Sequence, residues 1–113
     1  HRLMKELLEN ADEFIASAED NLIKERYNAS VSDFFKAIAN LCDYLIYREI
    51  KLLPKNHKER FDLLHTHFKE ISENLSDLFQ LYRESYNLRL KKEDALKLKH
   101  YAYELKKFVS SKE

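Results

Sequence analysis

Apolar residues recur at steps of three and four along most of the chain, which is the spacing of one face of an α-helix. The clearest stripe lies in the N-terminal part of the chain and consists of Leu3, Leu7, Leu8, Ala11, Phe14, Ile15, Ala18 and Leu22. Charged and polar residues fill most of the positions between them. The pattern predicts an amphipathic helix from about Arg2 to about Tyr27.

A second helix is predicted from the Asn28–Ser30 region to about Leu52. Ser30 is followed three residues later by Asp33, which resembles a capping pair that satisfies free amides at a helix start. The apolar face that follows is broad and comprises Val31, Phe34, Phe35, Ile38, Leu41, Cys42, Leu45 and Ile46. Its breadth predicts that this helix is the most buried one and that Cys42 is a core residue.

Pro54 marks the clearest break in the chain, because proline offers no backbone donor and disfavours helix at the residue before it. A shorter helix is predicted from about His57 to Ile71, with a weak break at Ser72–Asn74. A fourth helix then runs to about Leu90, and a last one begins at Lys92. The inward positions are predicted to be Phe61, Leu64, Phe68, Ile71, Leu75, Leu78, Phe79, Tyr82, Ala95, Leu98, Tyr101 or Ala102, Leu105, Phe108 and Val109.

Short connections favour antiparallel neighbours, so the predicted fold is all-α: an up-and-down antiparallel bundle of four main helices plus one short helix. The chain has 113 residues, which suits a single domain over residues 1–113. It contains no glycine, which counts strongly against a β-rich fold and removes the glycine-rich loops that cradle phosphates.

The charge balance limits the classes of partner. Lys plus Arg is 20 and Asp plus Glu is 20, so the formal net charge is zero. This balance argues against a general electrostatic grip on nucleic acid or on an anionic membrane, although it leaves room for a local patch. A single cysteine and the lack of a membrane-length apolar run lead us to expect a cytoplasmic protein with no membrane contact.

No cofactor and no metal site are expected. Metal sites in helical bundles need inward carboxylates and histidines at helical spacing, and the paired Glu-x-x-His motif is absent. His65 and His67 are two residues apart, so they point to different sides of a helix.

Two segments carry candidate chemistry. In the first, Arg60, His65 and His67 crowd the short helix, and Arg60 and His67 are spaced to share a face. An arginine with a histidine could hold a phosphate and move a proton, as RNA cleavage requires. The alternative is a polar outer face whose histidines have no function.

The second segment is Tyr82–Arg89. Arg83 and Asn87 are one turn apart, and so are Tyr82 and Tyr86. Together they could offer a forked cation, an amide and aromatic faces to a nucleotide phosphate and base. The alternative is a helix end whose tyrosines pack and whose arginine pairs with Glu84 or another surface acid.

Taken in order, several segments resemble those of HEPN domains. Tyr27–Ala37 resembles the opening of the second helix in that family, where an Asn-Ala start leads into paired aromatics and an alanine. Leu53–His57 resembles the family's Pro-Lys-Thr-His junction, with asparagine in place of threonine, and Phe61–Phe68 resembles the short helix after it. Tyr82–Tyr86 resembles the arginine-bearing fourth helix, and Ala102–Leu105 fits the last one. The resemblance covers about Leu3 to Val109.

The resemblance implies an all-helical bundle that is commonly a homodimer and that binds a nucleotide or RNA. Many members pair with a small nucleotidyltransferase in a toxin–antitoxin-like system, and others are metal-independent endoribonucleases. The nuclease members carry a histidine four to six residues after an arginine near the start of the fourth helix. After Arg83 that window holds Asn87, Leu88 and Arg89, and the similar spacing from Arg60 to His65 and His67 lies on the preceding short helix.

These departures favour binding over cleavage. We expect Arg83 to be the phosphate fork, with Asn28, His57, Tyr86 and Asn87 lining a cleft near a dimer contact. One alternative is a metal-independent ribonuclease that uses Arg60 or Arg83 with one of three histidines, which are His57, His65 and His67. The other is a helical adaptor that docks a protein partner and has no catalytic activity.

Overall fold

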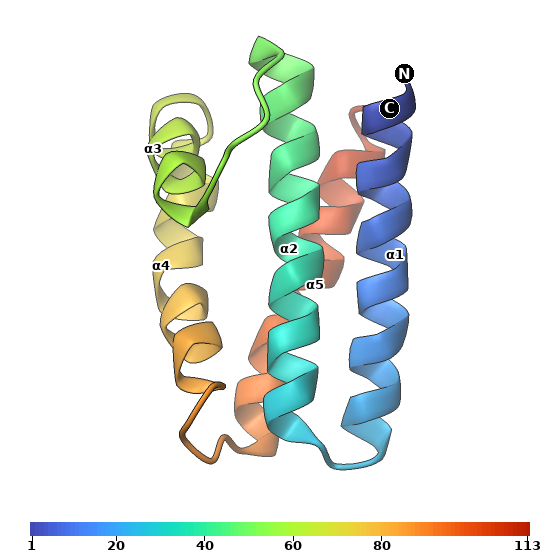
Figure 1. The fold of residues 1–113 in the computed structure, drawn as a ribbon, viewed down its shortest axis with the longest axis vertical. Coiled ribbons are helices and arrows are strands. Elements are labelled where there is room, and N and C mark those ends of the chain that lie inside the picture. The colour runs from blue at the N-terminus through green and yellow to red at the C-terminus, as the bar shows by residue number, and fades with distance from the viewer.

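The computed structural model describes all 113 residues and contains five α-helices and no strand (Figure 1). The helices are α1 (Arg2–Ile23), α2 (Tyr27–Ile50), α3 (His57–His67), α4 (Lys69–Glu84) and α5 (Lys92–Ser110). The four longer helices alternate in direction along the bundle axis, and the short α3 lies beside the C-terminal half of α2. The predicted all-α bundle of four main helices and one short helix is therefore confirmed.

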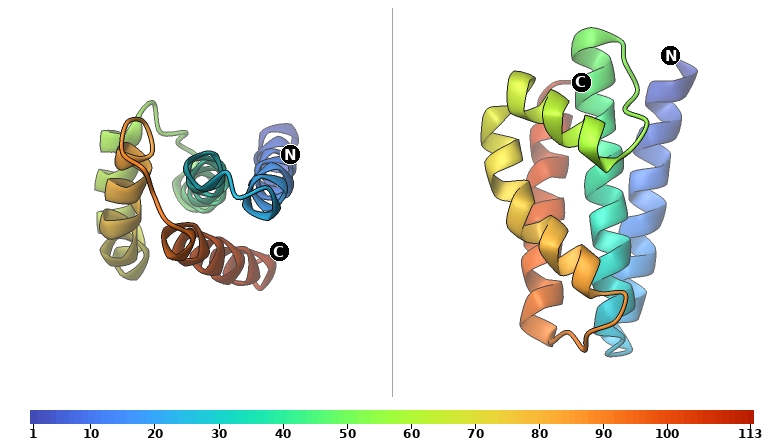
Figure 2. Two further views of the ribbon diagram at one scale, coloured as in Figure 1. Left: turned by 90° about the horizontal axis from the view of Figure 1, so that it is seen from below. Right: turned by 60° about the vertical axis from the view of Figure 1, so that its left-hand side comes forward.

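α2 is the central helix of the bundle. Seen along the bundle axis, α1, α5 and the α3–α4 pair surround it on three sides (Figure 2). Its side chains Phe34, Phe35, Ile38, Leu41 and Ile46 are among the largest that are fully buried. Cys42 is also buried, as predicted for a core residue, and burial raises the pKa of its thiol.

The junction between the first two helices lies earlier than predicted. α1 ends at Ile23 rather than near Tyr27, and Tyr27 is instead the first residue of α2. Glu25 takes a left-handed conformation, with φ of 60°, which breaks the helix between them. Ending a helix in this conformation usually calls for glycine, and the sequence offers none there.

Ser30 and Asp33 do not form the predicted capping pair, because both lie inside α2. The Ser30 hydroxyl is buried and donates to the carbonyl oxygen of Ala18 at 2.9 Å. The Asp33 carboxylate accepts from the Ser17 hydroxyl at 2.7 Å and from the Asn21 amide at 3.1 Å. The two side chains therefore join α2 to α1 instead of capping a helix.

The break at Pro54 is confirmed, and the local chemistry explains it. α2 ends at Ile50, and Lys51 turns the chain with a left-handed φ of 59°. Asn56 then caps α3, since its side-chain oxygen accepts from the backbone amide of Glu59 at 2.9 Å. This cap places His57 at the first position of α3.

The boundary between α3 and α4 lies at Phe68 and not at Ser72–Asn74. Phe68 leaves helical geometry, with φ of −142° and ψ of 62°, while its ring packs against the core. Helical spacing alone does not reveal this boundary, because Phe68 keeps an inward position although its backbone leaves the helix. Phe108 is another departure, because its side chain was predicted to face inward and is 39% exposed.

Candidate functional site

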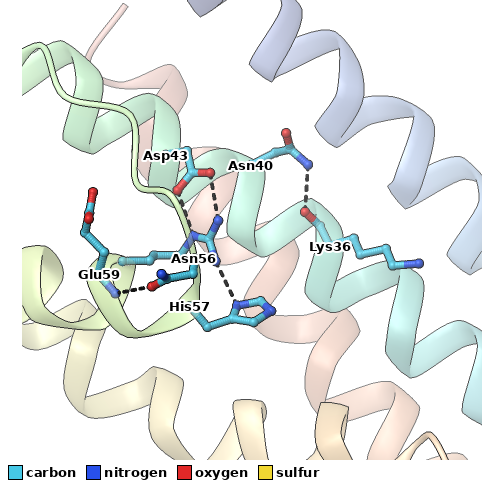
Figure 3. A network of polar contacts seen from close by, with 7 residues as sticks. Lys36, Asn40, Asp43, Asn56, His57 and Glu59 are labelled. Atoms are coloured by element: carbon cyan, nitrogen blue, oxygen red, sulfur yellow. Dashed lines mark hydrogen bonds and ion pairs between the residues drawn. The ribbon is translucent and has the colours of Figure 1, made fainter.

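An ion pair between α2 and α3 lies almost out of contact with water. The Arg60 guanidinium grips the Asp43 carboxylate with two hydrogen bonds, Nε to Oδ1 at 2.7 Å and Nη2 to Oδ2 at 2.9 Å (Figure 3). The two side chains are only 11% and 10% exposed. Burial lowers the pKa of Arg60, but the hydrogen bonds and charge of Asp43 outweigh it and raise the pKa.

His57 extends this ion pair to the start of α3. Its Nδ1 lies 2.8 Å from Nη1 of Arg60. Arginine is always protonated and can only donate, so Nδ1 must accept and the imidazole is neutral, with its proton on Nε2. Burial and the charge of Arg60 lower the pKa of His57, and Asp43 opposes them with a smaller effect.

An aromatic cluster lies against one side of the half-buried imidazole. We define it as Phe35 on α2, His57 and Phe61 on α3, and Phe79, Tyr82 and Tyr86 on or just after α4. The centre of the His57 ring lies 5.0 Å from that of Phe79 and 5.7 Å from that of Tyr82. Phe35 stacks on Tyr82 with the ring centres 4.6 Å apart. The cluster joins three helices, and its His57 member contacts the ion pair through Arg60.

Arg83 lies at the outer side of this cluster. Its guanidinium carbon is 5.9 Å from the centre of the Phe79 ring, within cation–π range. The side chain is exposed and belongs to none of the ion pairs of the chain. The neighbouring Glu84 accepts from Gln80 instead. The proposed pairing of Arg83 with a surface acid is therefore not formed.

The two tyrosines of this segment differ in exposure. Tyr82 is buried, whereas Tyr86 is 73% exposed, and their hydroxyl oxygens are 3.0 Å apart. Burial and this hydrogen bond raise the pKa of Tyr82 to about 12. Tyr86 therefore keeps its hydroxyl fixed to the cluster while most of its ring faces solvent.

Asn28 holds the loop that follows α4. Its amide nitrogen donates to the carbonyl oxygens of Ser85 and Leu88, and its oxygen accepts from the backbone amide of Leu90 at 3.0 Å. These contacts account for a further departure from the prediction, since α4 ends at Glu84 and not near Leu90.

The structure brings some of the predicted residues together and separates others. His57 and Arg83 both lie against the Phe79 ring, and Tyr86 joins them through Tyr82. Asn87 is exposed in the loop after α4. Arg60 and His67 were predicted to share a face, but Arg60 is buried against Asp43 whereas His67, like His65, is exposed. Arg60 therefore does not meet either of those histidines at a common surface.

Sequence reasoning missed Asp43, Phe35 and Phe79 as neighbours of the site. Asp43 did carry a signal, because it is the one charged residue in the buried run from Leu41 to Ile46. A buried charge is costly unless it is paired, so such a position requires a cation from elsewhere in the fold. The sequence does not say which cation.

A hollow of about 380 Å³ lies elsewhere, between the start of α4 and the C-terminal half of α5. Its apolar lining consists of Phe68, Ile71, Tyr101, Leu105 and Phe108. None of the predicted site residues borders it. The structure also contains no group of three His, Cys, Asp or Glu side chains placed to hold a metal ion.

Comparisons with known proteins do not assign this chain to a family. The chain matches no protein-family model, no curated protein and no solved structure. No helix has the length and apolar character needed to cross a membrane.

The His57 contact gives a prediction for the pH dependence of stability. The pKa of His57 is lower in the folded state than its ordinary value of about 6.5, so the unfolded state binds the proton more readily. The stabilising contribution is complete above about pH 6.5 and is lost as the pH falls through the folded-state pKa. We expect unfolding by urea to require less denaturant at about pH 5.5 than at about pH 7.5.

The matched control is His57→Gln, which removes the titrating group. The rest of the chain is identical in the two proteins, so its contribution cancels in the comparison. The wild-type chain should lose more stability than the variant over this pH interval. An equal loss in the two proteins would mean that the Arg60 contact does not hold His57 in its neutral form.

Proposed function

We propose that this domain binds the phosphate of a nucleotide or of RNA at the surface where α4 ends, with Arg83 as the phosphate fork. The observation that carries the proposal is that Arg83 is exposed, has no acidic partner and lies over the Phe79 ring, which His57 also contacts. An arginine held over an aromatic ring keeps its planar donors available for an anion. Arginine recognises phosphate through two parallel hydrogen bonds.

The groups beside Arg83 suit the remainder of a nucleotide. The exposed ring of Tyr86 offers a stacking surface for a base, and its hydroxyl is anchored to Tyr82. Asn87 follows it in the same loop and adds an amide donor and acceptor. The His57 side chain uses Nδ1 for Arg60 and makes no other hydrogen bond within the chain, so its Nε2 proton remains for a ligand.

The HEPN resemblance supports the same ligand class and extends it to the assembly. On that basis the expected state is a homodimer, and the expected partner is a small nucleotidyltransferase of a toxin–antitoxin-type pair. A dimer contact beside α4 would enclose the surface that a single chain leaves open.

The test is the affinity of the chain for ATP and for a short single-stranded RNA, measured by calorimetry. Arg83→Ala should weaken binding by about tenfold to a hundredfold, which is the effect of losing a charge-assisted hydrogen-bond pair. Arg48→Ala is the matched control, because Arg48 is also exposed and unpaired but lies near the opposite end of the bundle. Equal affinity in the wild-type chain and in both variants would exclude Arg83 as the phosphate ligand.

The ribonuclease alternative differs from the binding proposal in one measurable result, which is cleaved RNA. A neutral histidine with a lowered pKa is suited to proton transfer. His57 has this property, so cleavage of RNA should be tested directly. Arg60 is held by Asp43, so Arg83 is the cation that would face the phosphate. Cleavage of single-stranded RNA in EDTA that is lost in His57→Ala would assign a metal-independent ribonuclease, whereas binding without cleavage supports the proposal.

A further inference from the structure

We infer that Asn28 is a positioning residue, which holds the loop of residues 85–91 from across the bundle and thereby sets the place of Tyr86 beside Arg83. The inference rests on the proposed function, because it concerns how the binding surface at the end of α4 is built. It assigns Asn28 a role through other residues and not a contact with the ligand.

The hydrogen bonds of Asn28 all go to the backbone of this loop. The amide nitrogen uses its two protons for the carbonyl oxygens of Ser85, at 2.9 Å, and Leu88, and the side-chain oxygen accepts from Leu90. Both donors of the side chain are therefore occupied within the protein. A residue in this state has little left to offer a phosphate or a base.

Asn28 lies on a different helix from the loop that it holds, and far from that loop in the sequence. It is the second residue of α2, on the central helix, whereas the loop joins α4 to α5. The three bonds span sequence separations of 57 to 62 residues. One side chain on the most buried helix therefore fixes the end of α4 and the approach to α5 at the same time.

The loop has few other tethers. The backbone amides of residues 85–88 bond only to carbonyl groups in the last turns of α4. The Leu90 side chain packs in part against the core, and the Lys91 amide donates to Asp94 at the start of α5. Between these ends, the Ser85 and Tyr86 hydroxyl groups contact Tyr82 on α4. Asn28 supplies the side-chain hydrogen bonds that join the loop to α2.

Tyr86 lies between the loop carbonyl groups that Asn28 holds. Its hydroxyl is placed 3.0 Å from that of Tyr82, and its ring is otherwise exposed. If the loop were free, only this hydroxyl contact and the edge-on contact with the Tyr82 ring would hold Tyr86, and a single hydrogen bond is weak on its own. Loss of Asn28 should therefore move Tyr86 without changing Arg83 itself.

The experiment compares Asn28→Ala with Asn40→Ala. Asn40 lies on the same helix and donates only to the carbonyl oxygen of Lys36 one turn earlier, so its replacement removes a local contact (Figure 3). Two properties are measured on each variant: hydrogen exchange at the Leu90 amide without ligand, and the affinity for ATP and for a short single-stranded RNA. Exchange at core amides of α2, such as Ile38, reports whether the variant is folded.

For Asn28→Ala we expect exchange at Leu90 to rise by about tenfold while exchange at Ile38 stays slow. Its affinity should fall by about tenfold although Arg83 is present, and Asn40→Ala should behave as the wild-type chain in both measurements. If the alanine variant does not fold, Asn28→Ser provides the same comparison with a smaller change.

Three results would overturn the inference, and they differ from a failure of the proposed function. Unchanged exchange at Leu90 would mean that Asn28 does not hold the loop. Faster exchange with unchanged affinity would mean that the held loop does not position the binding surface. A similar loss of affinity in Asn40→Ala would show that the effect is not specific to Asn28. If the wild-type chain binds neither probe, the proposed function fails, and the positioning role for binding fails with it, whereas the exchange result still decides whether Asn28 tethers the loop.

Discussion

Asp43→Ala should lower the free energy of unfolding by about 3–5 kcal/mol, which is a large part of the stability of an ordinary domain of about 5–15 kcal/mol. The reason is that the buried Arg60 guanidinium remains after Asp43 is removed. Arg60 is nine-tenths buried, and without Asp43 its charge would have no counter-ion and two of its donors would have no acceptor. Thermal and urea unfolding of the variant measure the loss.

Two controls separate the cost of an unpaired charge from the value of the pair. Asp12 pairs with Lys106 at 2.6 Å, but these side chains are 59% and 43% exposed, so Asp12→Ala should cost less than about 1 kcal/mol. The double variant Asp43→Leu with Arg60→Met removes both charges and should recover most of the stability lost in Asp43→Ala. A double variant as unstable as the single one would show that the ion pair stabilises the fold in its own right.

Phe35→Ala should also be severely destabilising, by about 3–5 kcal/mol, because it removes a large ring from a packed interior. Phe35 is fully buried and contacts His57, Phe79 and Tyr82, so the cavity would open between α2 and the α3–α4 pair. The aromatic cluster would lose its central member. Denaturant unfolding with the same slope as the wild-type chain would attribute the change to stability alone.

Phe108→Ala is the matched control for this substitution. Phe108 is also a phenylalanine on a long helix, but it is 39% exposed, so less packing is lost when its ring is removed. Its cost should be clearly smaller than that of Phe35→Ala. Equal costs for the two variants would contradict the burial of Phe35 and the central place of the aromatic cluster.

The fold could be predicted because helices that pack side by side bury one face each, so their apolar residues recur at steps of three and four. In α1 the buried residues are Leu7, Ala11, Ile15 and Ala18, which are steps of three and four along one face. Helix ends carried less information. α1 and α2 end beside Glu25 and Lys51, which adopt left-handed conformations that glycine usually marks. Since the chain has no glycine, composition gave no signal at these turns.

The site could be predicted only in part, because its contacts join residues far apart in the sequence. Arg83 and Tyr86 were identified from local spacing, since they lie at one helix end. Arg83 is unpaired because the Glu84 carboxylate accepts from Gln80 instead. Residue spacing does not reveal which of these two partners Glu84 contacts. The partnership of Asp43 with Arg60 and the hold of Asn28 on the loop after α4 follow from how the helices pack. No periodic pattern records such polar contacts between helices.

The most direct test of the account is to map where ATP binds, by following backbone amide and arginine Nε signals in NMR spectra during a titration. The account predicts shifts gathered at Arg83, Tyr86 and Asn87, together with the backbone amide of His57. Signals around the apolar hollow, at Ile71 and Leu105, should stay in place. Shifts centred on that hollow, with the Arg83 signals unchanged, would contradict the claim that the end of α4 is the phosphate-binding surface.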